Sequence, residues 1–420
     1  MRVIHPPTLR RSPPPPPPSL YSRRLRLLLV PLVPLAIVFL RVATTTNEDI
    51  DVTPSSPSSY SVAVVMSASL PMRRARAKAA VLGAFVADAA SCPLQWIYDL
   101  SVLSSLLSPS SPAEEGWEFD RTKMRDPAFY PVPSCPWFDY PLGASSPYGD
   151  EILPLLRHLA MEAGGGGGSA GDFDPEGFAA ASYEFLRVYP GRLNHVSKLF
   201  VEARDAGKTG ADAAVDDAQA HGLVKVPLVV ARHCSDDDDP SDYSRTLRAV
   251  ESAVRVHQRN DASVDASLAF AAILRRLILA GGSVRDAALW AETSGDSPVS
   301  PDQRAILTEV RMAGKGIVRL SRVQIGIWGL SCSLPGVWKG LLYVAVHAES
   351  YREAVSFNIW AGGDVCSRNI GIGALWGAAT AVAGGMEGEE EKEERGIPME
   401  WRKKTNVLEE VEGLVNKMLG

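Results

Sequence analysis

Hydrophobic and polar positions alternate with a helical period along almost all of the chain after residue 72. Apolar residues recur every three or four positions, as expected when one face of a helix is buried. This pattern predicts helices at residues 75–90, 150–163, 176–188, 243–257, 261–279, 301–318, 337–348, 351–360, 370–383 and 407–419. Residues 224–231 are the best candidate for a strand, and they fit a buried helix equally well. We therefore expect an all-α fold in which residues 73–420 form a single large multi-helix domain.

Two of the predicted helices are rich in small residues. Residues 75–90 follow an alanine- and glycine-rich pattern that favours close contact with a neighbouring helix. Residues 371–377 look like a dinucleotide-binding fingerprint, but their last glycine comes one position late and the context is helical. Close helix packing through small residues explains this segment better.

Residues 1–72 differ in composition from the rest of the chain. Six consecutive prolines at residues 13–18 favour extended polyproline structure. Arginines then precede an apolar run at residues 27–40, which is typical of a signal peptide and short for a membrane span. We expect a disordered region with a signal- or anchor-like segment, and hence the secretory route, an organelle or membrane anchoring through this segment alone. If translation starts at Met66 instead, we expect a cytosolic protein.

The formal net charge of −6 hides an uneven distribution. Residues 1–72 carry seven arginines and three acidic residues, whereas residues 73–420 carry 36 basic and 46 acidic residues. No nucleic-acid partner is expected, because the phosphate backbone requires a basic surface. A cationic substrate, or an anionic one held through bound metal, fits the acidic domain better.

The cysteines are few and scattered. There are five of them, no two stand at Cys-x-x-Cys spacing, and the seven histidines form no His-x-x-x-His pair. A disulfide framework and a zinc site are therefore not expected. Reduced, mostly buried thiols are the simplest interpretation.

Candidate chemistry lies in two acidic turns bounded by glycine, at residues 148–151 and 362–367. Asp150 stands at the cap of one predicted helix, and Asp364 follows two glycines about six residues before another. Glycine lets the backbone approach a ligand closely, a helix N-terminus offers N–H donors, and a carboxylate there can hold a hard cation. Alternatively, each aspartate only caps its helix, a contribution of about 1 kcal/mol. Asp88, in the first predicted helix, is a third candidate.

Several short motifs between residues 78 and 402 occur together in one known family. Residues 79–89 read Ala-Ala-Val-Leu-Gly-Ala-Phe-Val-Ala-Asp-Ala, and residues 362–364 read Gly-Gly-Asp. With Ile370-Gly371, Gly396-Ile397-Pro398 and Trp401, this pattern resembles the opening helix and the closing segment of the ADP-ribosylglycohydrolase family. The match is closer to the branch of selenoprotein J and the jellyfish J-type crystallins. The residues that resemble this branch are 135–136, 141–143, 148–150, 256–261 and 363–368.

The resemblance implies an all-α domain with a central cleft that holds two magnesium ions. In the family these ions orient the ribose hydroxyls of ADP-ribose while water attacks the anomeric carbon. The implied partner is an ADP-ribosylated protein or a small ADP-ribosyl compound. Active members carry Thr-Asp-Asp in the first turn and Asp-x-Asp-Thr in the second. Here Gly149 and Cys366 replace two aspartates and Ser367 replaces the threonine, which predicts a diverged site with fewer than two magnesium ions or none.

The resemblance also implies roles for individual residues. The expected metal ligands are Asp150, Asp364 and Ser367. Asp150 or Glu151 is expected to activate water. The residues expected to contact the substrate are Asp88, Tyr148, Gly149, Gly363 and Cys366. Tyr148, Trp96 and Trp137 could stack on an adenine or could pack as ordinary aromatic side chains. Cys366 could instead be a small buried apolar side chain.

Two functions remain open from the sequence. The first is a hydrolase of the ADP-ribosylglycohydrolase type that acts on an ADP-ribosyl or related glycosidic linkage, which the intact glycines of both turns favour. The second is a non-catalytic, crystallin-like structural or ligand-binding protein with the same fold, which the replaced aspartates favour.

Overall fold

The computed structural model describes residues 68–107, 119, 124–164, 173–234, 242–315, 319–381 and 395–420. Within these residues the regular elements are helices, and β-type pairing is limited to three isolated bridges. The predicted all-α fold is therefore confirmed for the described part of the chain. The apolar run at residues 27–40 and Met66 lie outside it.

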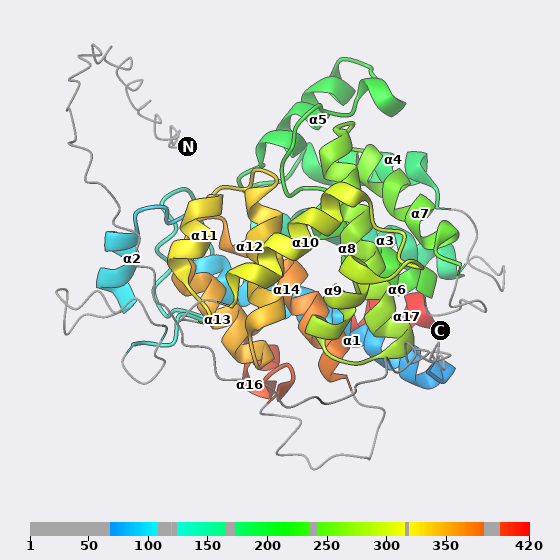
Figure 1. Cartoon of the computed structure of the whole chain (residues 1–420). Coiled ribbons are helices and arrows are strands. Elements are labelled where there is room, and N and C mark those ends of the chain that lie inside the picture. Colours follow the sequence, from blue (N-terminus) through cyan, green and yellow to red (C-terminus); the bar gives the residue numbers. More distant parts are fainter. Residues whose placement is uncertain are drawn as a thin grey trace, which may run out of the picture. The chain divides into compact units, whose positions relative to one another are not determined.

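The helices follow one another mostly through short connections (Figure 1). In chain order they are α1 (Leu70–Ser91), η1 (Cys92–Leu94), α2 (Leu100–Leu107), α3 (Pro147–Gly164), α4 (Pro175–Leu186), α5 (His195–Asp205), η2 (Gly210–Asp212), η3 (Leu223–Lys225), α6 (Val226–Cys234), α7 (Ser244–Arg255), α8 (Asp261–Ala280), α9 (Val284–Thr293), α10 (Pro301–Ala313), α11 (Arg322–Trp328), α12 (Gly336–His347), α13 (Tyr351–Ala361), α14 (Val365–Thr380), α16 (Met399–Lys404) and α17 (Leu408–Leu419).

Helices α1 and α14 pack against each other at the centre of the domain, and both are buried on nearly all sides. Their backbones touch. A Cβ atom added at Gly83 would lie 2.2 Å from the carbonyl oxygen of Gly373, and one at Gly373 would lie 2.3 Å from that of Gly83. A Cβ at Gly377 would lie 2.2 Å from the carbonyl oxygen of Ala79. The close packing predicted for the two small-residue segments is thus confirmed.

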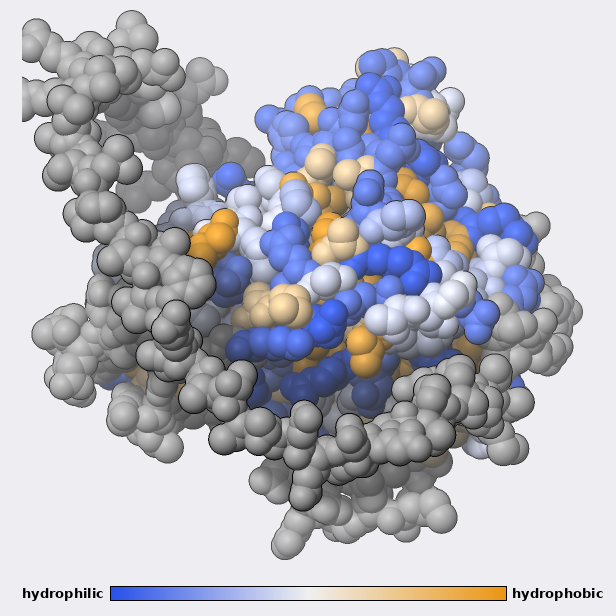
Figure 2. Space-filling model, in the orientation of Figure 1, coloured by the Kyte–Doolittle hydropathy of each residue, from blue (hydrophilic) through white to orange (hydrophobic). Residues whose placement is uncertain are grey.

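The other helices surround this central pair. Helices α6, α8, α12 and α13 contact α1 or α14, and α17 packs on α1 and α3. The hydroxyl of Tyr351, at the start of α13, donates a hydrogen bond to the carbonyl oxygen of Gly83 at 2.7 Å. Figure 2 shows that the described surface in this view is largely hydrophilic, with small hydrophobic patches between the polar side chains.

Several element boundaries differ from the sequence-based expectation, and three of these segments bear on the core and the candidate site. Residues 224–231 belong to η3 and α6; they are buried on every side, so no apolar face was visible in the pattern. Helix α3 begins at Pro147, which places Asp150 in its first turn rather than at its cap. Helix α14 begins at Val365 rather than at residue 370. Polar residues at 367–369 interrupt the apolar period there, yet all of them are buried.

One described helical segment, Leu70–Leu94, is long and apolar enough to cross a membrane. In its most apolar window 89% of the residues are buried inside the domain. Core helices of folded proteins have the same length and composition, so this segment is weak support for a membrane span.

Candidate functional site

The beginnings of α3 and α14 meet beside Asp88 of α1. The backbone N–H and the hydroxyl of Ser146, just before α3, donate to the two carboxylate oxygens of Asp88 at 2.8 and 2.5 Å. From α14, the Sγ atom of Cys366 lies 3.8 Å from the carbonyl oxygen of Asp88. Three segments that are far apart in the sequence thus bring the predicted site residues together.

Gly149 allows Asp88 to lie where it does. A Cβ atom at position 149 would be 2.1 Å from Oδ2 of Asp88 and 2.8 Å from its Cγ. The Asp88 carboxylate therefore fills the space that a side chain at 149 would need. This is the position at which the active relatives are expected to carry an aspartate, so one buried carboxylate stands in the place of another.

Burial raises the pKa of Asp88 from 3.8 to about 7, against the lowering effect of both Ser146 hydrogen bonds. The folded protein therefore keeps a proton on Asp88 that the unfolded chain releases above about pH 4. The stability from this group is complete below the unfolded pKa and is lost as the pH rises toward 7.

This shift predicts the pH dependence of an isosteric variant, Asp88→Asn, which has no proton to lose. We expect wild-type stability to fall relative to the variant by up to about 1.4 kcal/mol per pH unit between about pH 4 and 7. Urea denaturation of both proteins across this range measures the difference. All other titrating groups are common to the two proteins and cancel, so parallel stability curves would contradict the raised pKa.

The Asp364 carboxylate is fully buried and receives three hydrogen bonds. Gln95 Nε2 and Trp96 Nε1 donate to Oδ1 at 2.5 and 3.0 Å, and the Ser367 hydroxyl donates to Oδ2 at 2.5 Å. Burial raises the pKa of Asp364, while these donors and Arg368 oppose that shift. Ser367, one of the expected metal ligands, thus donates its hydroxyl proton in a hydrogen bond to the Asp364 carboxylate.

Arg368 is buried within the same turn. Its Nε donates to Oδ1 of Asn358 at 2.6 Å and its Nη2 to the carbonyl oxygen of Gly362 at 2.5 Å. Burial lowers the pKa of Arg368 to about 10, and the attraction of Asp364 opposes this. The guanidinium therefore stays charged at neutral pH and is the buried counter-charge of Asp364.

Gly362 and Gly363 give the turn its shape. Both have positive φ angles, 81° and 76°, which favour glycine. The N–H and carbonyl of Gly363 pair with the carbonyl of Ile97 and the N–H of Trp96 at 2.8 and 2.9 Å. Gly363 was expected to contact substrate; in the structure its two backbone groups bind the segment after η1.

Asp150 is half-buried and lies beside two tyrosines. The Tyr189 hydroxyl donates to Oδ2 of Asp150 at 2.6 Å, and the hydroxyls of Tyr140 and Tyr189 are 2.9 Å apart. Burial raises the pKa of Asp150 to about 6, and the hydrogen bond from Tyr189 opposes the rise. Asp150 is therefore largely ionised at neutral pH and remains partly open to solvent.

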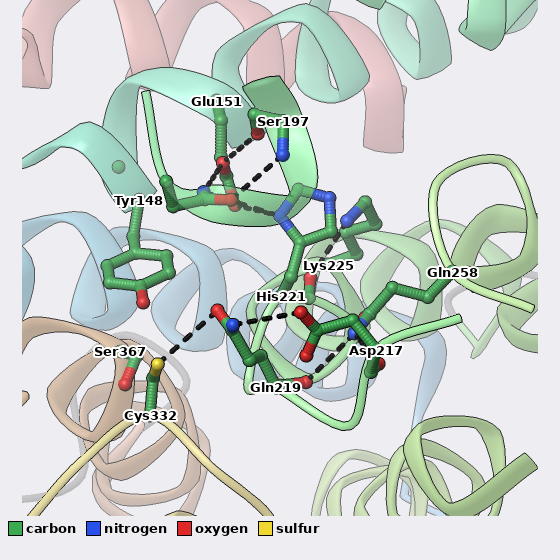
Figure 3. Close-up of polar contacts among 12 residues, drawn as sticks. Tyr148, Glu151, Ser197, Asp217, Gln219, His221, Lys225, Gln258, Cys332 and Ser367 are labelled. Atoms are coloured by element: carbon green, nitrogen blue, oxygen red, sulfur yellow. Dashed lines mark hydrogen bonds and ion pairs between the residues drawn. The ribbon is translucent and has the colours of Figure 1, made fainter. Parts of the chain in front are cut away.

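Glu151 is buried and lies in a polar cluster with Ser197 and His221 (Figure 3). The Asn194 side-chain amide and the Ser197 hydroxyl, the latter at 2.7 Å, donate to Oε2. His221 Nδ1 lies 2.7 Å from Oε1. Burial raises the pKa of Glu151 to about 7, and the charge of Lys225 opposes the rise. Of the two residues expected to activate water, only Asp150 is accessible to it.

Lys225 and His221 were not among the residues singled out in the sequence. Both are buried, and Lys225 Nζ donates to the carbonyl oxygen of His221 at 2.8 Å. Burial lowers the pKa of Lys225 to about 7, and the charge of Glu151 opposes this. The available signal was a lysine and a histidine next to the apolar segment 226–231, where long buried charges are rare.

The aromatic candidates divide by exposure. Tyr148 is 1% exposed and contacts Trp96 edge-on, with ring centres 6.2 Å apart, so both belong to the core. Trp137 is 53% exposed. The Arg192 guanidinium lies 4.7 Å from the centre of the Trp137 ring and 5.6 Å from that of Trp96. Of these three rings only that of Trp137 is exposed, and the Arg192 guanidinium lies over part of it.

Cys366 and Cys332 differ in setting. Cys366 is fully buried in the first turn of α14, which fits the interpretation of a small apolar side chain. Cys332 is half-buried near Tyr148 and lies 3.3 Å from the side-chain oxygen of Gln219 (Figure 3). Burial raises the pKa of both thiols, so neither resembles a reactive thiolate.

The residues present do not fit a pair of magnesium ions. In the described residues no three His, Cys, Asp or Glu side chains are grouped to hold a metal ion. The oxygens of Asp88 and Asp364 already accept hydrogen bonds from protein donors. Two divalent ions at close range need several free carboxylates to offset their mutual repulsion.

The chain matches a family model, two curated sequences and a solved structure. The family model described as ADP-ribosylglycohydrolase matches residues 69–420. Crystallin J1A and Crystallin J1B of Tripedalia cystophora are 28% and 27% identical over 321 and 324 residues, which cover 72% of this chain and 87% of each relative. A solved structure of an "ADP-ribosylglycohydrolase-related protein complex" matches with a TM-score of 0.54 and 16% identity, over 83% of this chain and 98% of that one. At this identity the structural match shows the fold.

Proposed function

Because this chain belongs to the ADP-ribosylglycohydrolase family, as its motifs indicated, we propose that it binds an ADP-ribosyl compound without magnesium-dependent hydrolysis. The observation that carries the proposal is the hydrogen bonding of two buried carboxylates. Every carboxylate oxygen of Asp88 and Asp364 accepts a hydrogen bond from a protein donor. A metal ion at either carboxylate would have to share its oxygens with donors that the core holds in place.

The relatives support a role that does not depend on catalysis. Two proteins called crystallins are similar in sequence to this chain over most of their length. The rim near Asp150 still offers groups that suit an ADP-ribosyl ligand. The exposed indole of Trp137 suits a planar base, and the Arg192 guanidinium beside it suits a diphosphate. Neither interaction needs a metal ion.

The test combines turnover and binding on the full chain. We expect no release of ADP-ribose from ADP-ribosylated protein or from small ADP-ribosyl compounds above the rate without protein, with magnesium or with EDTA. Calorimetric titration with ADP-ribose should show saturable binding of equal affinity under both conditions. Trp137→Ala should weaken that binding about tenfold, the loss of one stacking contact. The exposed Val132→Ala is the matched control and should leave the affinity unchanged.

Two outcomes would contradict this proposal. Magnesium-dependent turnover that disappears in Asp150→Ala would show that the diverged site still holds its metal. Absence of any heat with ADP-ribose would leave a structural protein without this ligand.

A metal-independent hydrolase is the second candidate, and Asp150 favours it. A half-buried carboxylate with a pKa of about 6 is ionised at neutral pH and can accept a proton from water. That water would add to the anomeric carbon while the bond to the leaving group breaks. In this case turnover persists in EDTA, falls by about two orders of magnitude or more in Asp150→Asn, and rises with pH through about 6.

A further inference from the structure

A cavity of about 440 Å³ lies away from the acidic turns, between α4, α5 and α7. This is the size of a small-molecule pocket. Three buried apolar side chains that line it are Phe200 of α5, Ala179 of α4 and Val256 after α7. Figure 1 shows these helices grouped at one side of the domain. The cavity thus offers an apolar floor to a ligand.

Three arginines line the wall of this cavity: Arg204, Arg248 and Arg255. Arg255 is already paired, with Glu251 at 2.7 Å and Asp261 at 3.1 Å. Arg204 and Arg248 form no ion pair with any carboxylate of the described residues. With Glu176 and Glu251 as the two carboxylates of the lining, the three arginines leave the cavity wall with a net positive charge.

Arg204 also has a buried donor without a partner. Its Nη1 atom is shielded from solvent and makes no hydrogen bond within the described structure. The guanidinium lies over the ring of Tyr183, 5.7 Å from its centre, which fixes the side chain. Buried donors are nearly always hydrogen-bonded, so this guanidinium has a donor to offer once it turns toward the cavity that it lines.

We propose that this cavity binds a small organic anion with a single negative charge. Its carboxylate or sulfonate oxygens accept hydrogen bonds from Arg204 and Arg248, and its apolar part lies on Phe200. Glu176 on the rim repels a second negative charge, which disfavours nucleotides and other polyanions. Glu251 does not, because Arg255 neutralises it.

This site is distinct from the one in the proposed function. Two histidine rings separate Phe200 from Glu151. The rings of Phe200 and His257 are 4.4 Å apart, those of His257 and His221 are 5.0 Å apart, and His221 contacts Glu151. The proposal therefore does not depend on whether ADP-ribose binds beside Asp150.

The experiment uses two dyes with nearly the same aromatic body. 8-Anilinonaphthalene-1-sulfonate carries one negative charge, and N-phenyl-1-naphthylamine is its neutral analogue. Fluorescence titration of the full chain should show saturable binding of the anionic dye and at least tenfold weaker binding of the neutral one. Arg204→Gln and Arg248→Gln should each weaken the anionic dye about tenfold, the loss of one charge-assisted hydrogen bond. ATP should not compete.

Two further variants serve as controls. Arg157→Gln changes an exposed arginine of α3 that does not line the cavity, and it should leave both affinities unchanged. Ser252→Trp fills the cavity without removing charge and should abolish binding of both dyes. The proposal would be overturned if Arg204→Gln and Arg248→Gln bound the anionic dye as tightly as the wild type does. It would also be overturned if the wild type bound the two dyes equally well. Because Arg248 is exposed, its variant remains informative even if Arg204→Gln fails to fold.

Discussion

Gly373→Ala is expected to lower the free energy of unfolding by about 3 kcal/mol, even though alanine favours a helix by about 1 kcal/mol over glycine. The reason is the contact between α1 and α14. The new Cβ atom would lie 2.3 Å from the carbonyl oxygen of Gly83 and 2.6 Å from the Cβ atom of Ala87. The oxygen belongs to backbone, so it cannot turn aside, and the two central helices must separate. Urea denaturation at neutral pH measures the change.

Gly413→Ala is the matched control, since Gly413 lies inside α17 and a Cβ atom there would meet nothing within 4 Å. We expect it to be neutral or to stabilise the protein by up to about 1 kcal/mol. Gly83→Ala should cost as much as Gly373→Ala, and the double variant less than the sum, because both relieve the same contact. Equal stabilities for Gly373→Ala and Gly413→Ala would show that the helix contact is loose.

Arg368→Met is expected to lower the free energy of unfolding by about 3–5 kcal/mol, the usual effect of leaving a buried charge without compensation. The change leaves the buried Asp364 carboxylate without its counter-charge. It also removes the donors to Asn358 and to the carbonyl of Gly362, so the turn before α14 loses its support. Urea denaturation at neutral pH again gives the value.

A second substitution separates charge from packing at Arg368. In the double variant Arg368→Met/Asp364→Asn the buried charge is gone as well, and we expect part of the lost stability to return. Arg402→Met, which breaks a partly exposed pair with Glu412, should cost less than about 1 kcal/mol. If Arg368→Met behaves like Arg402→Met, Arg368 does not balance Asp364.

The sequence-based prediction succeeded where the signal is local. The helical period predicted an all-α domain, and most long helices were found close to their expected positions. It left residues 224–231 open between a strand and a buried helix, because a helix buried on every side has no apolar face, and it failed at the start of α14, where buried polar residues hide the period. Helices α2 and α11 were missed because seven or eight residues give too little pattern, and α5 and α9, with 11 and 10 residues, were missed as well.

The sequence by itself determined the fold class, the family, the two small-residue segments that pack closely, and the two glycine-bounded acidic turns. These follow from properties of neighbouring residues: apolar period, the absence of a side chain in glycine, and short motifs. Only the tertiary structure decided the state of the carboxylates. Two of the three donors to Asp364, Gln95 and Trp96, stand 269 and 268 residues away in the chain, and Ser146, which donates to Asp88, stands 58 residues away. Which donors reach a buried oxygen depends on how the helices pack, and no local pattern encodes that.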